Sequence, residues 1–158
     1  MILVLMGVSG VGKTTIGVEL ARRLGWRFID ADDYHPPGNV AKMAAGTPLT
    51  DADRWPWLDT LNKELKSAAE AVVACSALKE VYRQRLLDGI RDYKLVFLTG
   101  SFHLIRSRLS ERRHRYMPAS LLESQFATLE PPERATEIDV AASVDACVEA
   151  ILKKLTLP

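Results

Sequence analysis

The chain has few cysteines, little net charge and no long hydrophobic run. Its 158 residues include only two cysteines, Cys75 and Cys147, which do not make the disulfide framework of a small secreted domain. Both lie in apolar surroundings, so we expect them to be buried and inert. The formal net charge is +1, which gives no overall electrostatic reason for the chain to bind nucleic acid or a membrane surface.

Membrane and secretion signals are also missing. No stretch approaches the roughly 18 apolar residues of a membrane span, and the N-terminus lacks the basic region and long apolar run of a signal peptide. These absences favour a cytoplasmic protein without membrane partners. The length and the 47% hydrophobic content predict one globular domain, residues 1–158, with a full core.

Against this ordinary background, residues 7–14 read Gly-Val-Ser-Gly-Val-Gly-Lys-Thr, the pattern of a phosphate-binding loop. An apolar run precedes them and a helical pattern follows, the context that the motif needs. Glycines let the loop turn its backbone N–H groups toward a polyphosphate at the positive end of the helix. The alternative is a glycine-rich turn with an incidental lysine. We predict that a nucleoside triphosphate binds at Gly7, Ser9, Gly10, Val11, Gly12, Lys13, Thr14 and Thr15.

The rest of the chain alternates short apolar runs with helical periodicity. Alternation of this kind predicts an α/β fold with a doubly wound, parallel, five-stranded sheet. The helix that begins at Asp51 is expected to continue to Ala71, and Val81 is expected on the buried face of the next helix. The strands are expected at residues 2–8, 27–31, 72–76, 95–99 and 138–141.

Two segments interrupt this alternation. Residues 32–57 are rich in proline and glycine and resemble an insertion that binds substrate, and residues 110–120 are strongly basic and resemble a lid. Both would project from the carboxyl ends of the strands, where ligands bind in such sheets. The connections near Ala71 and Ala135 are unusually short, so either the turns there are tight or loop residues are absent.

Carboxylates follow the second predicted strand. Asp30 and Asp32 are two residues apart, and strand alternation would put them on the same side, near Lys13 and Thr14. Lys13 would reach the β- and γ-phosphate oxygens, and the Thr14 hydroxyl would hold Mg²⁺. One carboxylate could accept the proton of an attacking hydroxyl and another could hold Mg²⁺. The alternative is a solvated acidic turn.

Cationic residues supply the remaining candidates. Arg54 suits a carboxylate on a small ligand, although the two tryptophans beside it could simply pack at the start of a helix. Ser76 and Lys79 follow the third strand, where a merely structural turn is the alternative. Arginines between residues 106 and 115, with Arg112 as our candidate, could close over the triphosphate, or could form a solvated helix face.

Six ordered blocks now resemble one family, the bacterial-type gluconokinases. They are Gly-Val-Ser-Gly-x-Gly-Lys, Asp-x-Asp-x-x-His-Pro, Asn-x-x-Lys-Met, Pro-Leu-x-Asp-x-Asp-Arg-x-Pro-Trp-Leu, Ala-Cys-Ser-Ala-Leu-Lys-x-x-Tyr-Arg and Met-Pro-x-x-Leu-Leu-x-Ser-Gln-Phe-x-Thr-Leu-Glu-x-Pro. The resemblance implies a P-loop kinase of the nucleoside monophosphate kinase-like group, with a core, a substrate-binding insertion and a lid. It implies that ATP and Mg²⁺ phosphorylate D-gluconate to 6-phospho-D-gluconate, and it suggests a homodimer.

The resemblance also assigns roles to residues. It makes Asp32 the contact to the reacting hydroxyl, and Asp30 is then expected to hold Mg²⁺ with Thr14. Lys13, Asp32 and Arg112 are the expected catalytic residues. The gluconate pocket is expected to contain or adjoin Asp32, His35, Asn39, Lys42, Arg54, Ser76, Lys79 and Arg83.

Other functions remain as alternatives. A kinase of shikimate, another sugar acid or a nucleoside monophosphate would share the phosphate loop. A GTPase switch would need Asn-Lys-x-Asp, whereas residues 62–65 read Asn-Lys-Glu-Leu. A nucleic-acid-processing ATPase would need a larger chain or a basic groove.

Overall fold

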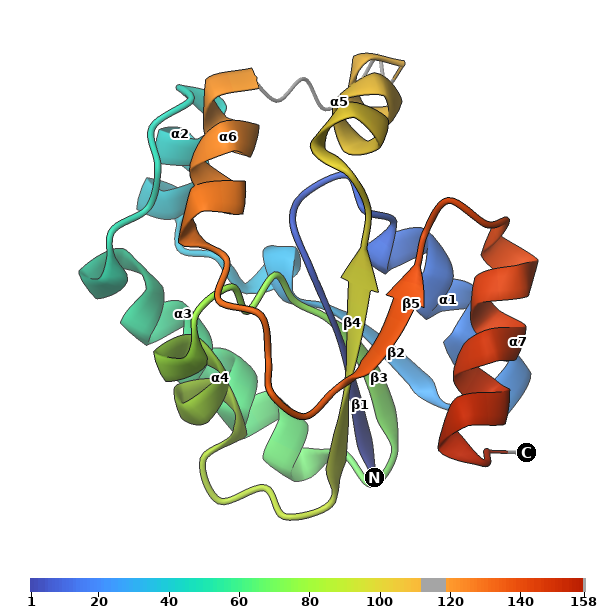
Figure 1. The fold of residues 1–158 in the computed structure, drawn as a ribbon. Helices are drawn as coiled ribbons and strands as arrows, with labels where there is room; N and C mark the ends of the chain where they lie inside the picture. The colour runs from blue at the N-terminus through green and yellow to red at the C-terminus, as the bar shows by residue number, and fades with distance from the viewer. Residues whose placement is uncertain (112–118, 158) are drawn as a thin grey trace.

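In the computed structural model, which describes residues 1–111 and 119–157, the strands form one parallel sheet. Over these residues the order is β2-β3-β1-β4-β5 (Figure 1). All of β1 is buried at the centre and so is its neighbour β3, because helices cover both faces, and this explains why these two strands are continuous apolar runs. The predicted doubly wound, five-stranded parallel sheet is confirmed. Its strands are β1 (Ile2–Met6), β2 (Arg27–Asp30), β3 (Ala71–Ala74), β4 (Tyr93–Thr99) and β5 (Thr136–Asp139).

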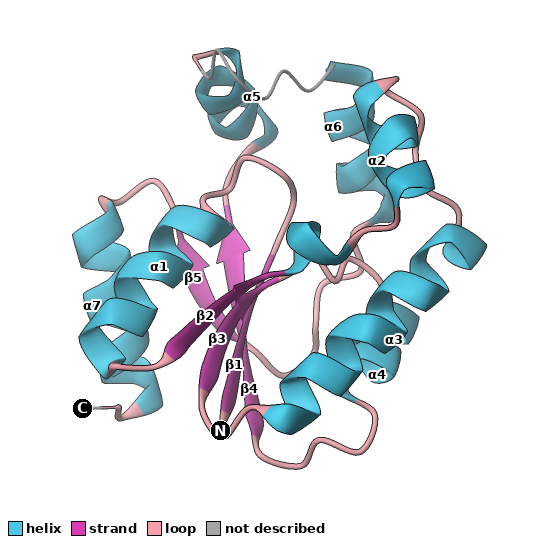
Figure 2. Ribbon diagram, turned by 180° about the vertical axis from the view of Figure 1, so that it is seen from behind, coloured by secondary structure: helices cyan, strands magenta, loops and turns pink. Residues whose placement is uncertain are grey.

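The helices form two layers and a group above the sheet. Helices α1 (Lys13–Leu24) and α7 (Val144–Leu155) cover one face, and α3 (Asp51–Ser67) and α4 (Glu80–Leu87) cover the other (Figure 2). The carboxyl ends of the strands point toward the third group (Figure 1). That group contains the 3₁₀ helix η1 (Ala31–Tyr34), α2 (Pro37–Ala44), α5 (Phe102–Ser110) and α6 (Ala119–Thr128).

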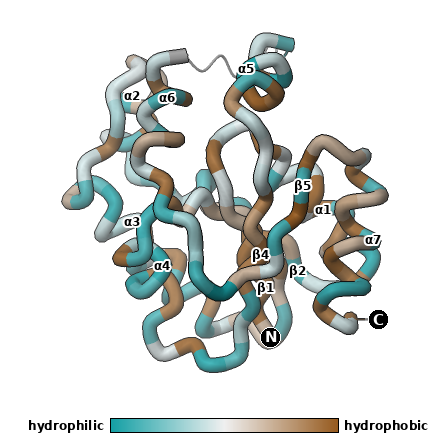
Figure 3. The backbone as a smooth tube through the Cα atoms, in the orientation of Figure 1, coloured by the Kyte–Doolittle hydropathy of each residue, from teal (hydrophilic) through white to brown (hydrophobic). Residues whose placement is uncertain are grey.

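Strand alternation divides the core into two clusters. Leu5 and Leu98 face α1 and α7 together with Ile151, whereas Val4 and Val73 face α3 and α4. Figure 3 shows the hydrophobic residues concentrated along the central strands, with hydrophilic residues on the outer turns. The sheet is therefore held rigidly from both sides, and the loops at its carboxyl end have a fixed base.

Two predictions about the helices differ from the structure. The helix that begins at Asp51 ends at Ser67 and not at Ala71. The N-terminal amine of Met1 donates a hydrogen bond to the Ala69 carbonyl (2.9 Å), so the turn before β3 is closed by a contact between distant parts of the chain. Val81 is 48% exposed because α4 begins only at Glu80 and turns this residue outward.

The connection from α6 to β5 is short, as expected, and crosses in front of the sheet (Figure 1). The Glu130 N–H donates to the Leu78 carbonyl (2.8 Å), and its carboxylate accepts from the Glu80 N–H at the start of α4 (3.0 Å). Helix α6 itself was not predicted; its first two residues overlap residues 110–120, which were interpreted as a lid. Most of that segment, including Arg112, lies outside the described residues.

Two negative findings concern the described part of the chain. No helix within residues 1–111 and 119–157 has the length and hydrophobicity needed to cross a membrane. Both cysteines are buried and free, as predicted, and burial raises the pKa of the Cys75 thiol to about 12. A thiol with so high a pKa is almost entirely protonated at neutral pH and is a poor nucleophile.

Candidate active site

The phosphate loop connects β1 to α1 through backbone conformations that favour glycine. Gly10 and Gly12 have φ angles of 83° and 102°, in the region that other L-residues rarely adopt. The Lys13 ammonium donates hydrogen bonds to the carbonyls of Gly7 and Val8, both at 3.0 Å. The loop therefore curls around its own lysine, at the N-terminus of α1, where backbone N–H groups and the helix dipole favour an anion.

A hydroxyl and a carboxylate meet beside this loop. The Thr14 hydroxyl donates to Oδ2 of Asp30 at 3.1 Å. Adjacent ligands of an octahedral Mg²⁺, each about 2.1 Å from the ion, are about 3 Å apart, so this oxygen pair fits the ion. No cluster of three or more His, Cys, Asp or Glu side chains that could hold a metal occurs in the described part of the chain. A magnesium ion here would therefore need oxygens from the nucleotide and water as well.

Asp32 lies in the same region, but a different element from the predicted strand positions it there. It lies in η1, outside the strand, so strand alternation does not explain its position. Its backbone N–H donates to Oδ1 of Asp30 (3.0 Å), which fixes the turn. The Asp32 side chain is 63% exposed and lines the cavity described next.

One cavity of about 700 Å³ lies at the carboxyl end of the sheet. It extends from the phosphate loop to α3 and the turn after β3, so the predicted nucleotide and acceptor residues face the same space. Gly7, Val11 and Thr15 belong to the loop or helix without lining the cavity. The predicted residues that line it are Ser9, Gly10, Gly12, Lys13, Thr14, Asp30, Asp32, His35, Arg54, Ser76 and Lys79.

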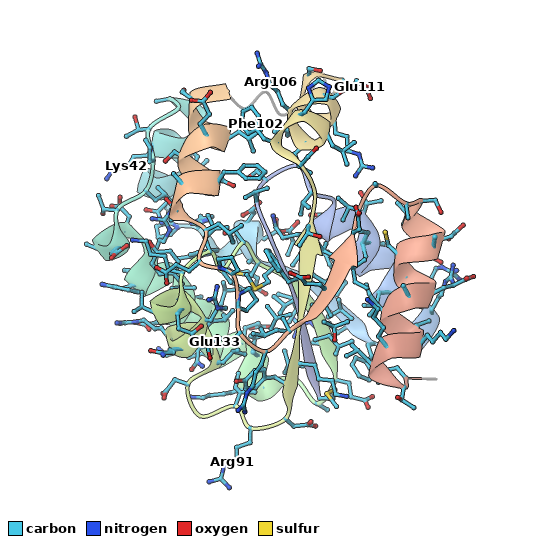
Figure 4. All side chains as sticks on the ribbon, in the orientation of Figure 1. Lys42, Arg91, Phe102, Arg106, Glu111 and Glu133 are labelled. Atoms are coloured by element: carbon cyan, nitrogen blue, oxygen red, sulfur yellow. The ribbon has the colours of Figure 1, made fainter. Side chains whose placement is uncertain are left out.

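Two predicted acceptor residues, Asn39 and Lys42, do not line the cavity. Asn39 is buried and donates to the Asp53 carbonyl (2.9 Å). Lys42 donates to Oδ2 of Asp53 (2.7 Å), and this bond, with those from Thr50, lowers the pKa of Asp53 to about 2. Figure 4 shows Lys42 on the outer side of α2. Both residues therefore join α2 to the start of α3, and direct substrate contact by either stays a prediction.

Arg83 does not line this cavity either. It is buried, pairs with Glu80 (2.9 Å) and donates to the carbonyl of Ala77 (2.9 Å). Ala77 has a φ of 45°, a strained conformation for alanine. The Arg83 guanidinium thus stabilises the turn that carries Lys79, and its direct contact with substrate stays a prediction.

Arg54 and Lys79, two of the cationic residues that line the cavity, share an aromatic partner that the sequence did not identify. Arg54 lies 4.9 Å from the ring centre of Tyr82 and Lys79 lies 5.6 Å from it. The Tyr82 hydroxyl donates to Asp51, which also pairs with Lys79 (3.6 Å). Burial, together with this bond, raises the pKa of Tyr82 to about 12. The ring is a neutral platform that holds two cations at one end of the cavity.

A second missed residue, Gln125, joins α6 to the phosphate loop. Its carbonyl oxygen accepts from the Ser9 N–H (2.7 Å) and its amide donates to the Ser9 hydroxyl (3.0 Å). Leu109 of α5 lies against the same loop, so that a Cβ on Gly10 would come within 2.6 Å of its side chain. Gln125 and Tyr82 both lie within the blocks that resemble the family, and this was the signal that could have identified them.

Comparisons with known proteins agree with this geometry. The shikimate kinase family model matches residues 9–135. A gluconokinase of Gluconobacter oxydans is 51% identical over 134 residues, covering 82% of this chain and 75% of the relative. A probable gluconokinase of Xenopus tropicalis is 45% identical over 174 residues, covering 98% of this chain and 91% of the relative. Because that alignment is longer than the 158-residue chain, the relative contains residues that this chain lacks, consistent with short connections.

The solved structure of a gluconokinase from Sinorhizobium meliloti superposes with a TM-score of 0.91 at 42% identity, covering 98% of this chain and 90% of that one. Its similarity extends over the whole cavity-forming part of the fold, not the phosphate loop alone. The shikimate kinase family model and the gluconokinase relatives together identify an ATP-dependent carbohydrate kinase. The chain belongs to the gluconokinase family, within the shikimate kinase-like P-loop kinases.

Proposed function

We propose that this enzyme transfers the γ-phosphoryl group of ATP to the C6 hydroxyl of D-gluconate, forming 6-phospho-D-gluconate and ADP. The observation that carries the proposal is the shared cavity, in which the phosphate loop and Asp32 face the same space as Arg54 and Lys79. Since phosphoryl transfer depends mainly on positioning and electrostatic stabilisation, one cavity that holds both substrates meets its principal requirement.

On the nucleotide side, the loop amides and Lys13 would bind the phosphates. Lys13 now donates to two loop carbonyls, and it would exchange at least one of these bonds for a β- or γ-phosphate oxygen. Thr14 and Asp30 would hold Mg²⁺ through the oxygen pair described above. When bound, Mg²⁺ supplies positive charge that stabilises the phosphoryl oxygens.

On the acceptor side, Asp32 would orient the C6 hydroxyl and accept its proton as the oxygen attacks phosphorus. Its exposed carboxylate lies two residues beyond Asp30, close to where the γ-phosphate must lie. The gluconate carboxylate would bind to Arg54 and Lys79. The Arg54 guanidinium donates to the Leu49 carbonyl and lies over the Tyr82 ring; neither contact neutralises its charge, which can therefore attract an anionic ligand.

The proposal is tested by measuring ADP release with Mg-ATP and a panel of acceptors. D-gluconate should be phosphorylated, whereas sorbitol, a polyol of similar length without the carboxylate, should react with a much higher KM. Shikimate, other aldonates and nucleoside monophosphates complete the panel. No turnover with gluconate, but turnover with one of these acceptors, would overturn the assignment.

Three parts of the proposal are expectations from the sequence alone. Arg112 as the lid arginine that neutralises the transferred group remains a prediction, as do the homodimer and the cytoplasmic location. Variant kinetics of Arg112→Lys, sedimentation of the purified protein and cell fractionation would test them in turn.

A further inference from the structure

His35 is a buried side chain whose ring has a fixed orientation. Its side chain is only 3% exposed, and it stacks on Trp57 with the ring centres 4.1 Å apart and the planes 16° from parallel. Trp57 is held in turn by a hydrogen bond from its indole N–H to the Ala31 carbonyl (2.7 Å). The stack therefore connects η1, which carries Asp32, to the body of α3.

The amide of Asn39 determines which nitrogen of His35 can carry a proton. Asn39 Nδ2 lies 2.9 Å from the Asp53 carbonyl, which can only accept, so this end of the amide must be the NH₂ group. The same Nδ2 lies 3.2 Å from Nδ1 of His35. Its second hydrogen points at Nδ1, and Nδ1 must therefore accept and carry no proton. A neutral His35 then has its proton on Nε2.

The protonated nitrogen faces the catalytic carboxylate. Nε2 of His35 lies 3.8 Å from Oδ1 of Asp32, and His35 lines the cavity. The two charged groups that act on the ring have opposite effects: Asp32 of η1 favours the cation and Arg54 of α3 disfavours it. Burial is the largest effect and lowers the pKa of His35. A cation would also place an N–H on Nδ1 against the NH₂ group of Asn39.

We propose that Asn39 fixes His35 in the Nε2–H tautomer, and that His35 is a positioning residue whose Nε2–H holds the Asp32 carboxylate toward the acceptor hydroxyl. The distance of 3.8 Å becomes a hydrogen bond after a small rotation of the exposed Asp32 side chain. When the His35 Nε2–H donates to Oδ1 of Asp32, Oδ2 of Asp32 can accept the proton of the acceptor hydroxyl. His35 itself gains and loses no proton during the reaction. This inference rests on the proposed role of Asp32 in phosphoryl transfer.

The tautomer can be measured without any substrate. The chain has three histidines, so a long-range ¹H–¹⁵N correlation spectrum of histidine-labelled protein is simple, and the signals missing from the His35→Gln variant identify His35. We expect Nδ1 of His35 to have the chemical shift of an unprotonated nitrogen and Nε2 that of a protonated one at neutral pH. A protonated Nδ1 would overturn the inference. Because no turnover is involved, this result is independent of whether gluconate is the acceptor.

Two substitutions of His35 separate the donor from the rest of the ring. Gln places an amide nitrogen near the position of Nε2, whereas Asn reaches only the position of Nδ1; both abolish the stack on Trp57. We expect kcat of His35→Asn to fall about tenfold to a hundredfold, the range for a hydrogen bond to a charged group, and His35→Gln to recover most of this loss. Thermal unfolding shows whether the two variants are equally stable. Equal kcat in two equally stable variants would contradict a donor role.

Asn39→Asp provides a third readout, the pH profile. A carboxylate at position 39 would accept a hydrogen bond from Nδ1–H. Neutral His35 would then carry its proton on Nδ1 instead of Nε2, and the added negative charge would favour the cation, which carries a proton on both nitrogens. We therefore expect kcat to become dependent on pH near neutrality. Asn62→Asp is the matched control, since Asn62 is also buried and donates to two carbonyls, those of Leu86 and Asp88 (2.8 and 2.9 Å), outside the cavity. An unchanged pH profile in Asn39→Asp, with His35 still in the Nε2–H form, would refute the role of Asn39.

Discussion

The two sides of the cavity are built in different ways. On the phosphate side, the bonds that shape the loop join residues close in the chain, such as Lys13 to Gly7 and Val8, six and five positions apart. On the acceptor side, Trp57 bonds to Ala31 across 26 positions and Tyr82 to Asp51 across 31. The curl of the phosphate loop is thus set mainly by local bonds, with Gln125 joining Ser9 to α6 across 116 positions, whereas the acceptor site exists only once several distant elements have packed.

This difference explains why kinases that act on different acceptors can have the same phosphate loop. A loop made from backbone N–H groups requires mainly glycines, a lysine and a following helix, supported here by contacts of Gln125 and Leu109. The acceptor side depends on η1, α2, α3 and the turn before α4, which hold each other through side chains. Changes on the acceptor side should therefore alter substrate use, and changes in the loop should alter nucleotide binding.

The largest expected effect comes from removing the carboxylate that faces the acceptor. Asp32→Asn keeps the size of the side chain but cannot accept a proton, so kcat should fall about 10²- to 10⁴-fold, the usual contribution of a general base. Calorimetric titration should show nearly unchanged ATP affinity, because the phosphate loop is untouched. If ATP binding is lost instead, while the bound complex still turns over normally, Asp32 does not act on the acceptor.

A methyl group in the phosphate loop should weaken ATP binding, which the Asp32→Asn substitution leaves nearly unchanged. In Gly10→Ala the new Cβ would lie 2.6 Å from Leu109, at a φ of +83°. Backbone strain and overpacking together should lower the free energy of unfolding by about 2–4 kcal/mol, and ATP affinity should fall at least tenfold.

Gly38→Ala is the control for this substitution, because a Cβ at Gly38 meets no heavy atom within 4 Å. It should leave ATP affinity unchanged and should stabilise the fold by about 0.4–1 kcal/mol, as for alanine in an unstrained helical position. Chemical denaturation and ATP titration of both variants provide the comparison. Equal ATP affinity in the two variants would show that the loop tolerates a side chain at Gly10.

A smaller effect, confined to acceptor binding, is expected for Arg54→Met. Loss of a charged hydrogen bond to the gluconate carboxylate should raise the KM for gluconate about 10- to 100-fold, with a smaller change in kcat. Arg85→Met is a closely matched control, since Arg85 lies 4.9 Å above Trp55, the distance that separates Arg54 from Tyr82. Steady-state kinetics should show the rise in KM for Arg54→Met only. The same rise in both variants would point to a general loss of packing.

The same contrast accounts for what the sequence could predict. The phosphate loop was identified from eight consecutive residues, and the sheet from apolar runs that are buried on both faces. Local patterns were sufficient for both. The position of Asp32 was predicted for the wrong reason, because a 3₁₀ turn and not strand alternation brings it beside Asp30.

The acceptor side was only partly predictable. Arg54 and Lys79 were selected from the sequence and line the cavity, but the ring of Tyr82 that both contact depends on how α3 packs on α4. Asn39 and Arg83 carry chemistry that suits a ligand, yet packing directs their side chains to backbone carbonyls. Residue type and spacing predict which groups are near a site, whereas long-range packing decides which of them face the cavity.

The smallest expected effect is on the pH dependence of stability, and it tests whether His35 is buried on the acceptor side in solution. Burial lowers the pKa of His35, so as the pH falls below about 6.5 the histidine of the unfolded chain is protonated first. The unfolded state then binds more protons than the folded state, and the free energy of unfolding decreases as the pH falls toward the lowered pKa. His35→Gln has no such group, so its stability should depend less steeply on pH. Urea unfolding of both proteins at pH 7.5, 6.5 and 5.5 measures this difference, because all other titratable groups are present in both. Parallel pH dependences would mean that His35 is protonated as easily in the folded protein as in the unfolded chain, and that the acceptor side is more open to water than its packing indicates.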